Sequence, residues 1–221
     1  MHNNVNQLVS IKKEIQTKII DLNYKDYKPK IIAVSKTFSI SEILPLINYG
    51  QKDFGENKVQ EAIEKWTDIK KDFTDIKLHM IGKLQTNKVK YAVPLFDYIH
   101  SLDSVKLAEK IANQQIKLKK ELKIFIQVNI GNEIQKSGIE VENLELFYHK
   151  CINDFNLKIV GLMCLPPNNG EVSIYFSKLK DLSDKLKFLE SSMGMSNDYL
   201  KACEYKSTFL RIGSKIFGNR Y

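Results

Sequence analysis

Apolar residues along the chain follow two patterns, short continuous runs and longer stretches in which they recur every three or four positions. The clearest continuous run is Ile31-Ile32-Ala33-Val34, which leads into the polar residues Ser35-Lys36-Thr37. An unbroken apolar run is typical of a strand buried on both faces, as in a parallel sheet. Runs of this kind predict strands that begin near Ile31, Asp53, Lys77, Tyr98, Lys123, Leu157, Leu189 and Thr208.

Stretches with helical spacing of apolar residues lie between these strands. They predict helices over residues 41–49, 57–66, 86–93, 105–118, 142–152, 172–188 and 197–203, and a short turn over 214–218. A leading helix over 4–22 and a loop to residue 30 are expected to cap the fold. Eight strands, each followed by a helix, predict an α/β fold, a single (β/α)8 TIM barrel over residues 1–221. An open doubly wound sheet would alternate similarly, but eight repeats favour closure.

The composition is that of an ordinary globular chain, with 43% hydrophobic and 27% charged residues among 221. No apolar run has transmembrane length, and the first ten residues lack the apolar core of a signal peptide. The three cysteines, Cys151, Cys164 and Cys203, have no CxxC spacing. These features predict reduced thiols in a cytoplasmic protein without a membrane partner.

The net charge of +8 raises the question of a polyanionic partner. The basic residues are almost all lysines interspersed with Asp and Glu, which favours solvated helix faces over a nucleic-acid groove. We therefore predict no nucleic-acid partner. Only two arginines occur, Arg211 and Arg220. In so lysine-rich a chain, an arginine suggests a site that needs a planar, permanently charged group.

Lys36 follows the first predicted strand at its carboxyl end, where α/β folds build their active sites. Apolar walls would disfavour the ammonium form, lower the pKa of this lysine and free its amine for a Schiff base with an aldehyde. The alternative is a solvated lysine just past a strand, and this segment alone favours that alternative.

Residues 192–197 and 210–218 end the last two strands, and each contains a glycine followed by a hydroxyl residue at an expected helix start. Unpaired N–H groups at such a start suit a phosphate, and phosphate sites recur at this place in barrels. Ser196 and Ser214 would add hydroxyl groups, unless they merely cap their helices. Because the first and eighth strands are neighbours in a barrel, a phosphorylated aldehyde could reach both this cradle and Lys36. Pyridoxal 5'-phosphate (PLP) and a phosphosugar both fit.

Arg211 helps to distinguish these ligands. Inside the barrel mouth its guanidinium would donate to a pyridine nitrogen and keep that nitrogen unprotonated, because arginine has no acceptor and keeps its proton. An unprotonated ring is a poorer electron sink. The alternative for Arg211 is a surface ion pair.

The four histidines, His2, His79, His100 and His149, lack metal-ligand spacing, so no metal site is predicted. His79 and His100 lie in or beside predicted strands. We interpret both as structural histidines with satisfied hydrogen bonds.

Short motifs from residue 31 onward keep the order and spacing of a known family. They are Ala33-Val34-Ser35-Lys36-Thr37, Phe54-Gly55-Glu56-Asn57, His79-Met80-Ile81-Gly82, Gln127-Val128-Asn129-Ile130, Lys136-Ser137-Gly138-Ile139, Gly161-Leu162-Met163, Ser192-Met193-Gly194-Met195-Ser196, Arg211-Ile212-Gly213 and Ile216-Phe217-Gly218. With these motifs the chain resembles the pyridoxal phosphate homeostasis proteins, the YggS/PROSC/PLPBP family. The resemblance implies a barrel like the amino-terminal domain of alanine racemase. It also implies the site residues Lys36 (covalent aldimine), Asn57 (pocket lining), Arg211 (ring nitrogen), and Ser196, Gly213 and Ser214 (phosphate).

The implied role is to bind PLP, keep the free aldehyde low inside the cell and deliver the cofactor to apo-enzymes. No substrate turnover is expected, since racemases of this fold add a second domain and this chain ends at Tyr221. A monomer is expected. Lys136, after the fifth strand, is hypothesised to take part in hand-over of the cofactor. Three alternatives stay open: a PLP-dependent amino-acid racemase, a cofactor-free aldolase that uses Lys36 on a phosphosugar, and a polyanion-binding protein.

Overall fold

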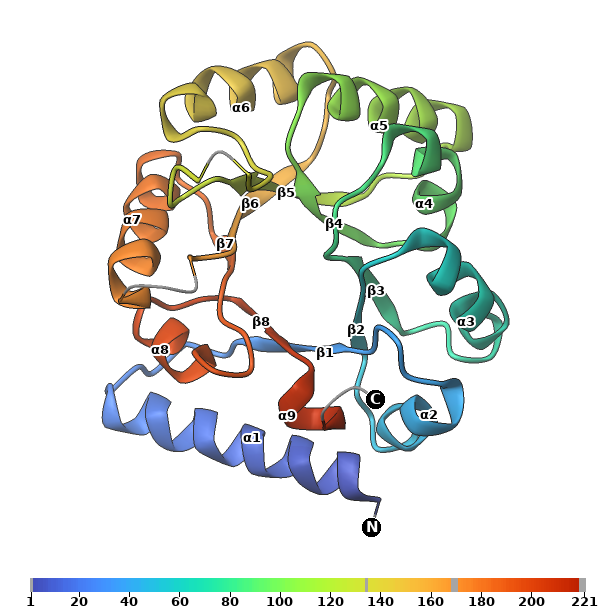
Figure 1. Ribbon diagram of the computed structural model, residues 1–221, viewed down its shortest axis with the longest axis vertical. Coiled ribbons are helices and arrows are strands. Elements are labelled where there is room, and N and C mark those ends of the chain that lie inside the picture. Colours follow the sequence, from blue (N-terminus) through green and yellow to red (C-terminus); the bar gives the residue numbers. More distant parts are fainter. Residues whose placement is uncertain (1, 134, 168–170, 219–221) are drawn as a thin grey trace.

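Eight parallel strands pair in sequence order and close into a barrel in the computed structural model of the chain (Figure 1). The structure describes residues 2–133, 135–167 and 171–218. The predicted (β/α)8 barrel is therefore confirmed. The strands are β1 (Lys30–Val34), β2 (Asp53–Glu56), β3 (Lys77–Met80), β4 (Tyr98–Leu102), β5 (Lys123–Val128), β6 (Ile159–Cys164), β7 (Glu190–Ser192) and β8 (Phe209–Ile212).

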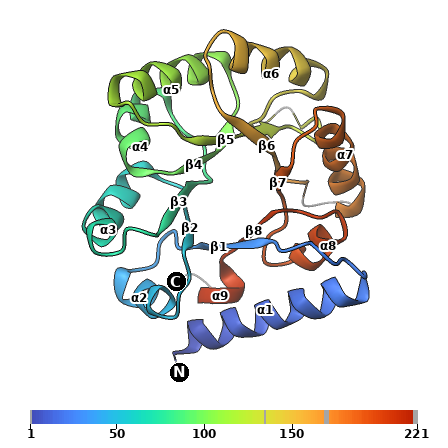
Figure 2. The same cartoon turned by 180° about the vertical axis from the view of Figure 1, so that it is seen from behind.

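Helices follow the strands and form the outer layer of the barrel (Figure 2). They are α2 (Ile40–Asn48), α3 (Val59–Asp72), α4 (Val89–Leu95), α5 (Val105–Leu118), α6 (Leu144–Asn153), α7 (Val172–Lys185), α8 (Tyr199–Glu204) and α9 (Ser214–Phe217), with 3-10 turns η1 (Thr86–Lys88) and η2 (Val141–Asn143). Helix α3 continues to Asp72, past its predicted end at Trp66, because no proline or glycine follows and Ile69, one turn on, still packs against the core. Helix α7 ends before residue 188, where Lys187 adopts a left-handed conformation at φ 58°.

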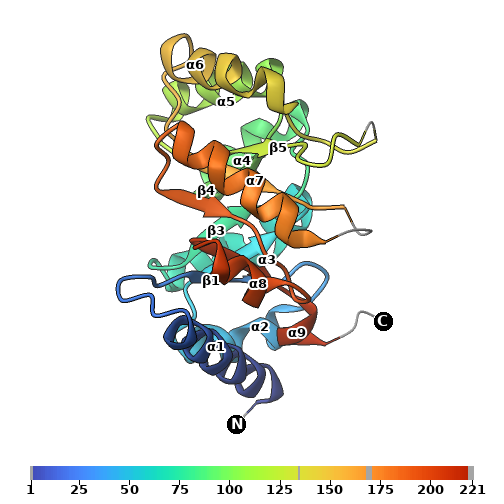
Figure 3. The ribbon, with the colours of Figure 1, turned by 90° about the vertical axis from the view of Figure 1, so that its left-hand side faces the viewer.

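The leading helix α1 (Asn3–Asp21) lies along the barrel wall beside β1 and β8, and not across either end (Figures 1 and 3). Its neighbours are α2, α8 and α9. The buried residues of its apolar face are Val5, Leu8, Ile11, Ile15 and Ile19. Because α9 has only one turn, α1 supplies the outer layer at this part of the wall.

Side chains alternate between the barrel interior and the helix layer along each strand, as the two-residue period of a strand requires. Strand β1 shows the pattern: Ile32 and Val34 face the interior, and Ile31 and Ala33 pack toward the helices. Both faces of this strand are buried, as its continuous apolar run predicted. The interior is filled by the cluster Ile32, Val34, Tyr98, Phe125, Met163 and Phe209.

Parallel pairing puts the carboxyl ends of all eight strands at one end of the barrel, which we call the rim. In the side view the loop after β5 and the short helix α9 project toward the same side (Figure 3). Within the described part of the chain, no helix is long and apolar enough to cross a membrane.

Candidate functional site

The predicted site residues come together at the rim and just inside it. Lys36 follows β1, Asn57 follows β2, Ser196 follows β7, and Gly213 and Ser214 follow β8, while Arg211 lies within β8. Strands β1 and β8 are paired, with Ala33 opposite Ile212. A side-chain carbon added to Gly213 would lie 3.3 Å from Cβ of Val34. The turn after β8 therefore lies beside the strand that carries Lys36.

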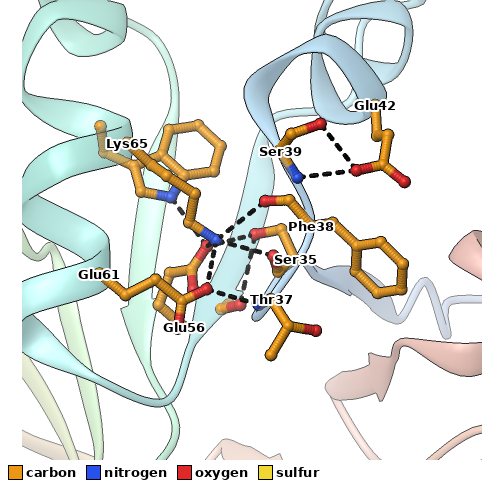
Figure 4. Close-up of polar contacts among 10 residues, drawn as sticks. Ser35, Thr37, Phe38, Ser39, Glu42, Glu56, Glu61 and Lys65 are labelled. Atoms are coloured by element: carbon orange, nitrogen blue, oxygen red, sulfur yellow. Dashed lines mark hydrogen bonds and ion pairs between the residues drawn. The ribbon is translucent and has the colours of Figure 1, made fainter. Parts of the chain in front are cut away.

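The loop that contains Lys36 is held by one lysine of the neighbouring helix, as Figure 4 shows. Lys65 of α3 donates to the carbonyl of Ser35 at 2.8 Å and to the carbonyl of Phe38 at 3.3 Å. These two carbonyls lie on either side of Lys36 in the chain. Lys36 itself is half-buried. Its backbone is thus fixed by contacts that do not involve its own amine.

Two carboxylates hold Lys65 in turn. Its ammonium lies 2.7 Å from Glu56 of β2 and 2.8 Å from Glu61 of α3. Glu61 also accepts a hydrogen bond from the N–H of Thr37. Thr37 has a φ of 69°, in the left-handed region that non-glycine residues rarely adopt. Hydrogen bonds from Lys65 and Thr37 lower the pKa of Glu61 although partial burial opposes them.

Glu56 is the buried centre of this cluster, which we call the Lys65 clamp (Glu56, Glu61 and Lys65). It is fully buried and accepts from Ser35 Oγ at 2.7 Å and from Trp66 Nε1 at 3.0 Å. Burial raises the pKa of Glu56 although Lys65 opposes the shift. The role of this cluster was not predicted from the sequence. Two features of the sequence could have pointed to this cluster, a carboxylate inside a predicted strand and the single tryptophan of the chain.

The turns after β7 and β8 meet through one hydroxyl group. Oγ of Ser196 accepts from the backbone N–H of Gly213 at 3.2 Å and of Lys215 at 3.3 Å. Helix α8 begins at Tyr199, after Asp198, so the alternative that Ser196 merely caps this helix is wrong. Two N–H groups that converge on one oxygen form the concave geometry that binds anions. Ser214 is exposed beside them as the first residue of α9.

Helix α9 is anchored to α1 and α8 by a second lysine. Nζ of Lys215 lies 2.7 Å from Glu14 of α1 and 2.6 Å from the hydroxyl of Tyr199 of α8. Tyr199 also donates to Glu14. Burial alone would lower the pKa of Lys215, but its bonds to Glu14 and Tyr199 raise it. The leading helix thus fixes the turn whose N–H groups face Ser196.

Arg211 points into the barrel and is only 4% exposed. Its guanidinium donates to Oγ of Ser192 at 2.6 Å and to the carbonyl of Cys164 at 2.8 Å. The alternative of a surface ion pair is therefore wrong. Across residues 2–133, 135–167 and 171–218 no ion pair joins Arg211 to a carboxylate. Burial lowers the pKa of this guanidinium, since a buried cation without a carboxylate is unfavourable.

Asn57 and Lys136 also lie at the rim. The backbone of Asn57 packs against Gly82, where an added side-chain carbon would come within 2.4 Å of the Asn57 carbonyl oxygen. Lys136 pairs with Glu133 at 2.5 Å and donates to the carbonyl of Pro166 at 3.3 Å. Its loop follows β5, across the ring from β1 and β8.

Several other groups lie outside this site. His79 and His100 are fully buried and hydrogen-bonded, as predicted. The three cysteines are buried and unpaired with one another. In the described ranges no group of three or more His, Cys, Asp or Glu residues could hold a metal ion. A hollow of about 490 Å³ near Tyr24, Tyr27 and Glu190 lies at the amino ends of β7 and β8, away from the rim.

Comparison with known sequences identifies relatives along nearly the whole chain. The family described as alanine racemase, N-terminal domain, matches residues 16–220. A pyridoxal phosphate homeostasis protein of Aquifex aeolicus is 40% identical over 200 residues, which cover 86% of this chain and 87% of that protein. A pyridoxal phosphate homeostasis protein of Haemophilus influenzae is 36% identical over 220 residues, which cover 95% of this chain and 93% of that protein.

Solved structures give the same result. PipY of Synechococcus elongatus, solved with PLP bound, has a TM-score of 0.81 and 32% identity and covers 92% of this chain and 100% of its own. Alanine racemase of Clostridium difficile has a TM-score of 0.69 at 13% identity. It covers 94% of this chain and 56% of its own, and this likeness concerns the fold alone.

Proposed function

The chain belongs to the alanine racemase N-terminal domain family and, within it, to the pyridoxal phosphate homeostasis proteins, and we propose that it binds PLP for intracellular PLP homeostasis. Lys36 binds the cofactor covalently, Ser196, Gly213 and Ser214 hold its phosphate, Arg211 donates to its ring nitrogen, and Asn57 lines the pocket. When bound, PLP supplies an aldehyde that condenses with an amine, with loss of water, in a link that another amine can displace.

The convergence of two N–H groups on Ser196, beside the strand that carries Lys36, is the observation that carries this proposal. A phosphate oxygen could take the place that the hydroxyl now occupies in front of these groups, or accept from the hydroxyl itself. Arg211 fits the other end of the ligand. It is a buried cation with N–H donors beyond the two already used, and a pyridine nitrogen is an acceptor of the required kind. The residues present therefore fit PLP.

The protein acts as a carrier without substrate turnover. A guanidinium at the ring nitrogen keeps that nitrogen unprotonated and weakens the ring as an electron sink, which disfavours carbanion chemistry. The relatives from Aquifex aeolicus and Haemophilus influenzae carry a homeostasis name, which supports the same role. An amino-acid racemase is the rival function. Incubation of the loaded protein with each L-amino acid, followed by chiral analysis, separates the two, and sustained turnover would reject the carrier role.

The cellular setting follows from the same role. The carrier is a cytoplasmic monomer that delivers PLP to apo-enzymes, and its buried free cysteines are compatible with a reducing compartment. Lys136 assists hand-over from the far side of the rim. Transfer of PLP from the loaded carrier to an apo-enzyme, measured as gain of that enzyme's activity, should slow in Lys136→Ala. An unchanged rate would remove Lys136 from the proposal.

Absorption spectroscopy tests the binding proposal directly. The wild-type protein loaded with PLP should show the visible band of a lysine-linked cofactor, and Lys36→Ala should lack it. Lys58→Ala is the matched control, because Lys58 is an exposed lysine just past the next strand. This control should keep the band. A band of equal strength in Lys36→Ala, or its loss in Lys58→Ala, would contradict the assignment of Lys36.

A further inference from the structure

A continuous chain of hydrogen bonds crosses the barrel interior and ends at Arg211. Asp53 Oδ1 lies 3.0 Å from His79 Nε2, and His79 Nδ1 lies 2.9 Å from His100 Nε2. His100 Nδ1 lies 2.9 Å from Ser192 Oγ, which accepts from Arg211 at 2.6 Å. The chain runs from the amino end of β2, through β3 and β4, to the carboxyl end of β7 and then to β8. We call these first four residues, Asp53, His79, His100 and Ser192, the relay.

The chemistry of the two ends determines the direction of every bond in the relay. The carboxylate of Asp53 only accepts, so Nε2 of a neutral His79 carries the proton and Nδ1 accepts. His100 must then donate from Nε2 and accept at Nδ1, which requires the hydroxyl of Ser192 to donate. Arg211 has only donors, so it donates to a lone pair of the Ser192 oxygen. Every hydrogen bond is therefore donated in the direction from the guanidinium toward the carboxylate. No donor along the chain faces a donor, and no acceptor faces an acceptor.

The surroundings keep both histidines neutral, as this arrangement requires. His79 stacks on Tyr98 at 4.3 Å and His100 stacks on Phe125 at 4.4 Å, and both histidines are fully buried. Burial lowers the pKa of His79 although Asp53 opposes the shift. Burial, together with His79 and Arg211, places the pKa of His100 well below its usual value. Asp53 is the partly exposed end of the relay, with a side chain 18% exposed.

We propose that Asp53, His79, His100 and Ser192 are positioning residues that orient the guanidinium of Arg211 and supply its missing counter-charge through aligned hydrogen bonds. The effect on the ligand rests on the proposed function, because it concerns the donor that faces the ring nitrogen of PLP. Arg211 has no carboxylate partner of its own among the residues that the structure describes. The relay links it to the carboxylate of Asp53, at the amino end of β2.

The apo-protein gives a test that does not depend on PLP. The chain has only two arginines, so protein labelled with 15N-arginine gives two sets of guanidinium signals, and Arg220→Lys assigns them. Exchange of the Arg211 guanidinium protons with deuterated water should be about tenfold faster in His79→Phe, because Ser192 loses its link to Asp53 and the charge-assisted hydrogen bond that it accepts from Arg211 weakens. Phe keeps the stacking on Tyr98 and removes both hydrogen bonds. His79 itself touches neither Arg211 nor the rim.

A conservative variant and a matched control separate the relay from a general loss of stability. In His79→Gln the amide donates to Asp53 and its oxygen accepts from His100, so exchange should return to within about twofold of wild type. Glu121→Gln removes a carboxylate just before β5, at the same end of the barrel as Asp53, that is 66% exposed and pairs with Lys158 at 2.7 Å. It should leave Arg211 unchanged. Asp53→Leu cuts the partly exposed end of the relay and should also accelerate exchange severalfold. This variant provides the test if His79→Phe does not fold.

The loaded protein tests the consequence for the ligand. With PLP labelled with 15N in the ring, the wild type should give the signal of an unprotonated pyridine. His79→Phe and Ser192→Ala should shift the signal toward the protonated form, and His79→Gln should not. Wild-type exchange rates in folded His79→Phe and Asp53→Leu, or equal acceleration in Glu121→Gln, would overturn the relay. Failure of the wild type to bind PLP would instead overturn the proposed function and leave the exchange test intact.

Discussion

Removal of the ammonium group of Lys65 tests whether the Lys65 clamp fixes the loop of Lys36. Lys65 is 11% exposed, and its partner Glu56 is fully buried. Breaking a buried ion pair by removing one partner costs about 3–5 kcal/mol, because the other charge stays buried and unpaired. Glu56 can limit this cost by taking up a proton, since burial already raises its pKa. We therefore expect Lys65→Met to lose about 3 kcal/mol of unfolding free energy at neutral pH.

The pH dependence of this loss has a definite sign. Without Lys65 the pKa of Glu56 in the folded state rises further above its usual value, so the folded state binds more protons than the unfolded state. Stability should then fall as the pH rises through this range. Urea unfolding at a series of pH values should show a larger loss for Lys65→Met at pH 8 than at pH 5, because protonated Glu56 needs no cation.

Two further variants decide between this explanation and a general effect on α3. Lys71→Met removes an exposed lysine of the same helix that pairs with Asp68, and it should leave the urea midpoint unchanged. The double variant Lys65→Met/Glu56→Gln removes both charges and should regain part of the loss. PLP binding by Lys65→Met should weaken, because the carbonyls of Ser35 and Phe38 lose their donor. A loss no greater than that of Lys71→Met would refute the reasoning.

Further predictions concern the interior histidines and the turns near Ser196. Stability should fall as the pH drops below about 6.5, because the buried histidines have lowered pKa values and the unfolded state then binds more protons than the folded state. The urea midpoint of His100→Phe should therefore depend less on pH than that of the wild type. Ser196→Ala should raise the Kd for PLP about tenfold by removing one hydroxyl contact to the phosphate, measured by absorbance titration. Glu14→Gln, which weakens the anchor of α9, should raise that Kd a few-fold, and an unchanged Kd would show that α1 does not support the site. Gly194→Ala should lower the melting temperature, because φ is 91° and the added carbon would lie 2.6 Å from Cβ of Ala202.

The barrel, and the gathering of the candidate site residues at one rim, could be predicted because both depend on local patterns. A run such as residues 31–34 indicates a strand buried on both faces whatever its neighbours are, and eight strand–helix repeats leave few topologies. Parallel pairing then brings every residue that follows a strand to one rim. Lys36, Ser196 and Gly213 reach the rim by this rule alone. The end of α3 was harder to predict, because Ile69 is the only apolar residue between Trp66 and the end of the helix at Asp72.

The contacts that hold the site could not be predicted, because each joins side chains far apart in the chain. Lys65 contacts Ser35 and Phe38, and Lys215 contacts Glu14, only once the helices have packed. The relay depends on the stagger of the strands around the barrel, which determines whether His79 of β3 faces His100 of β4 at bonding distance. The sequence indicated that these histidines were structural, but it did not indicate their common link to Arg211.

Three separate sets of contacts prepare the rim before a ligand arrives. The Lys65 clamp fixes the backbone on both sides of Lys36, α1 fixes α9 and its N–H groups, and the relay fixes Arg211. A rigid site of this kind lowers the entropic cost of binding, which favours a tight non-covalent complex. Tight binding alone would oppose release, but a covalent link that another amine can displace gives release a chemical route. An ordered rim combined with the exchangeable bond proposed for Lys36 would therefore suit the proposed role of storing PLP and passing it on.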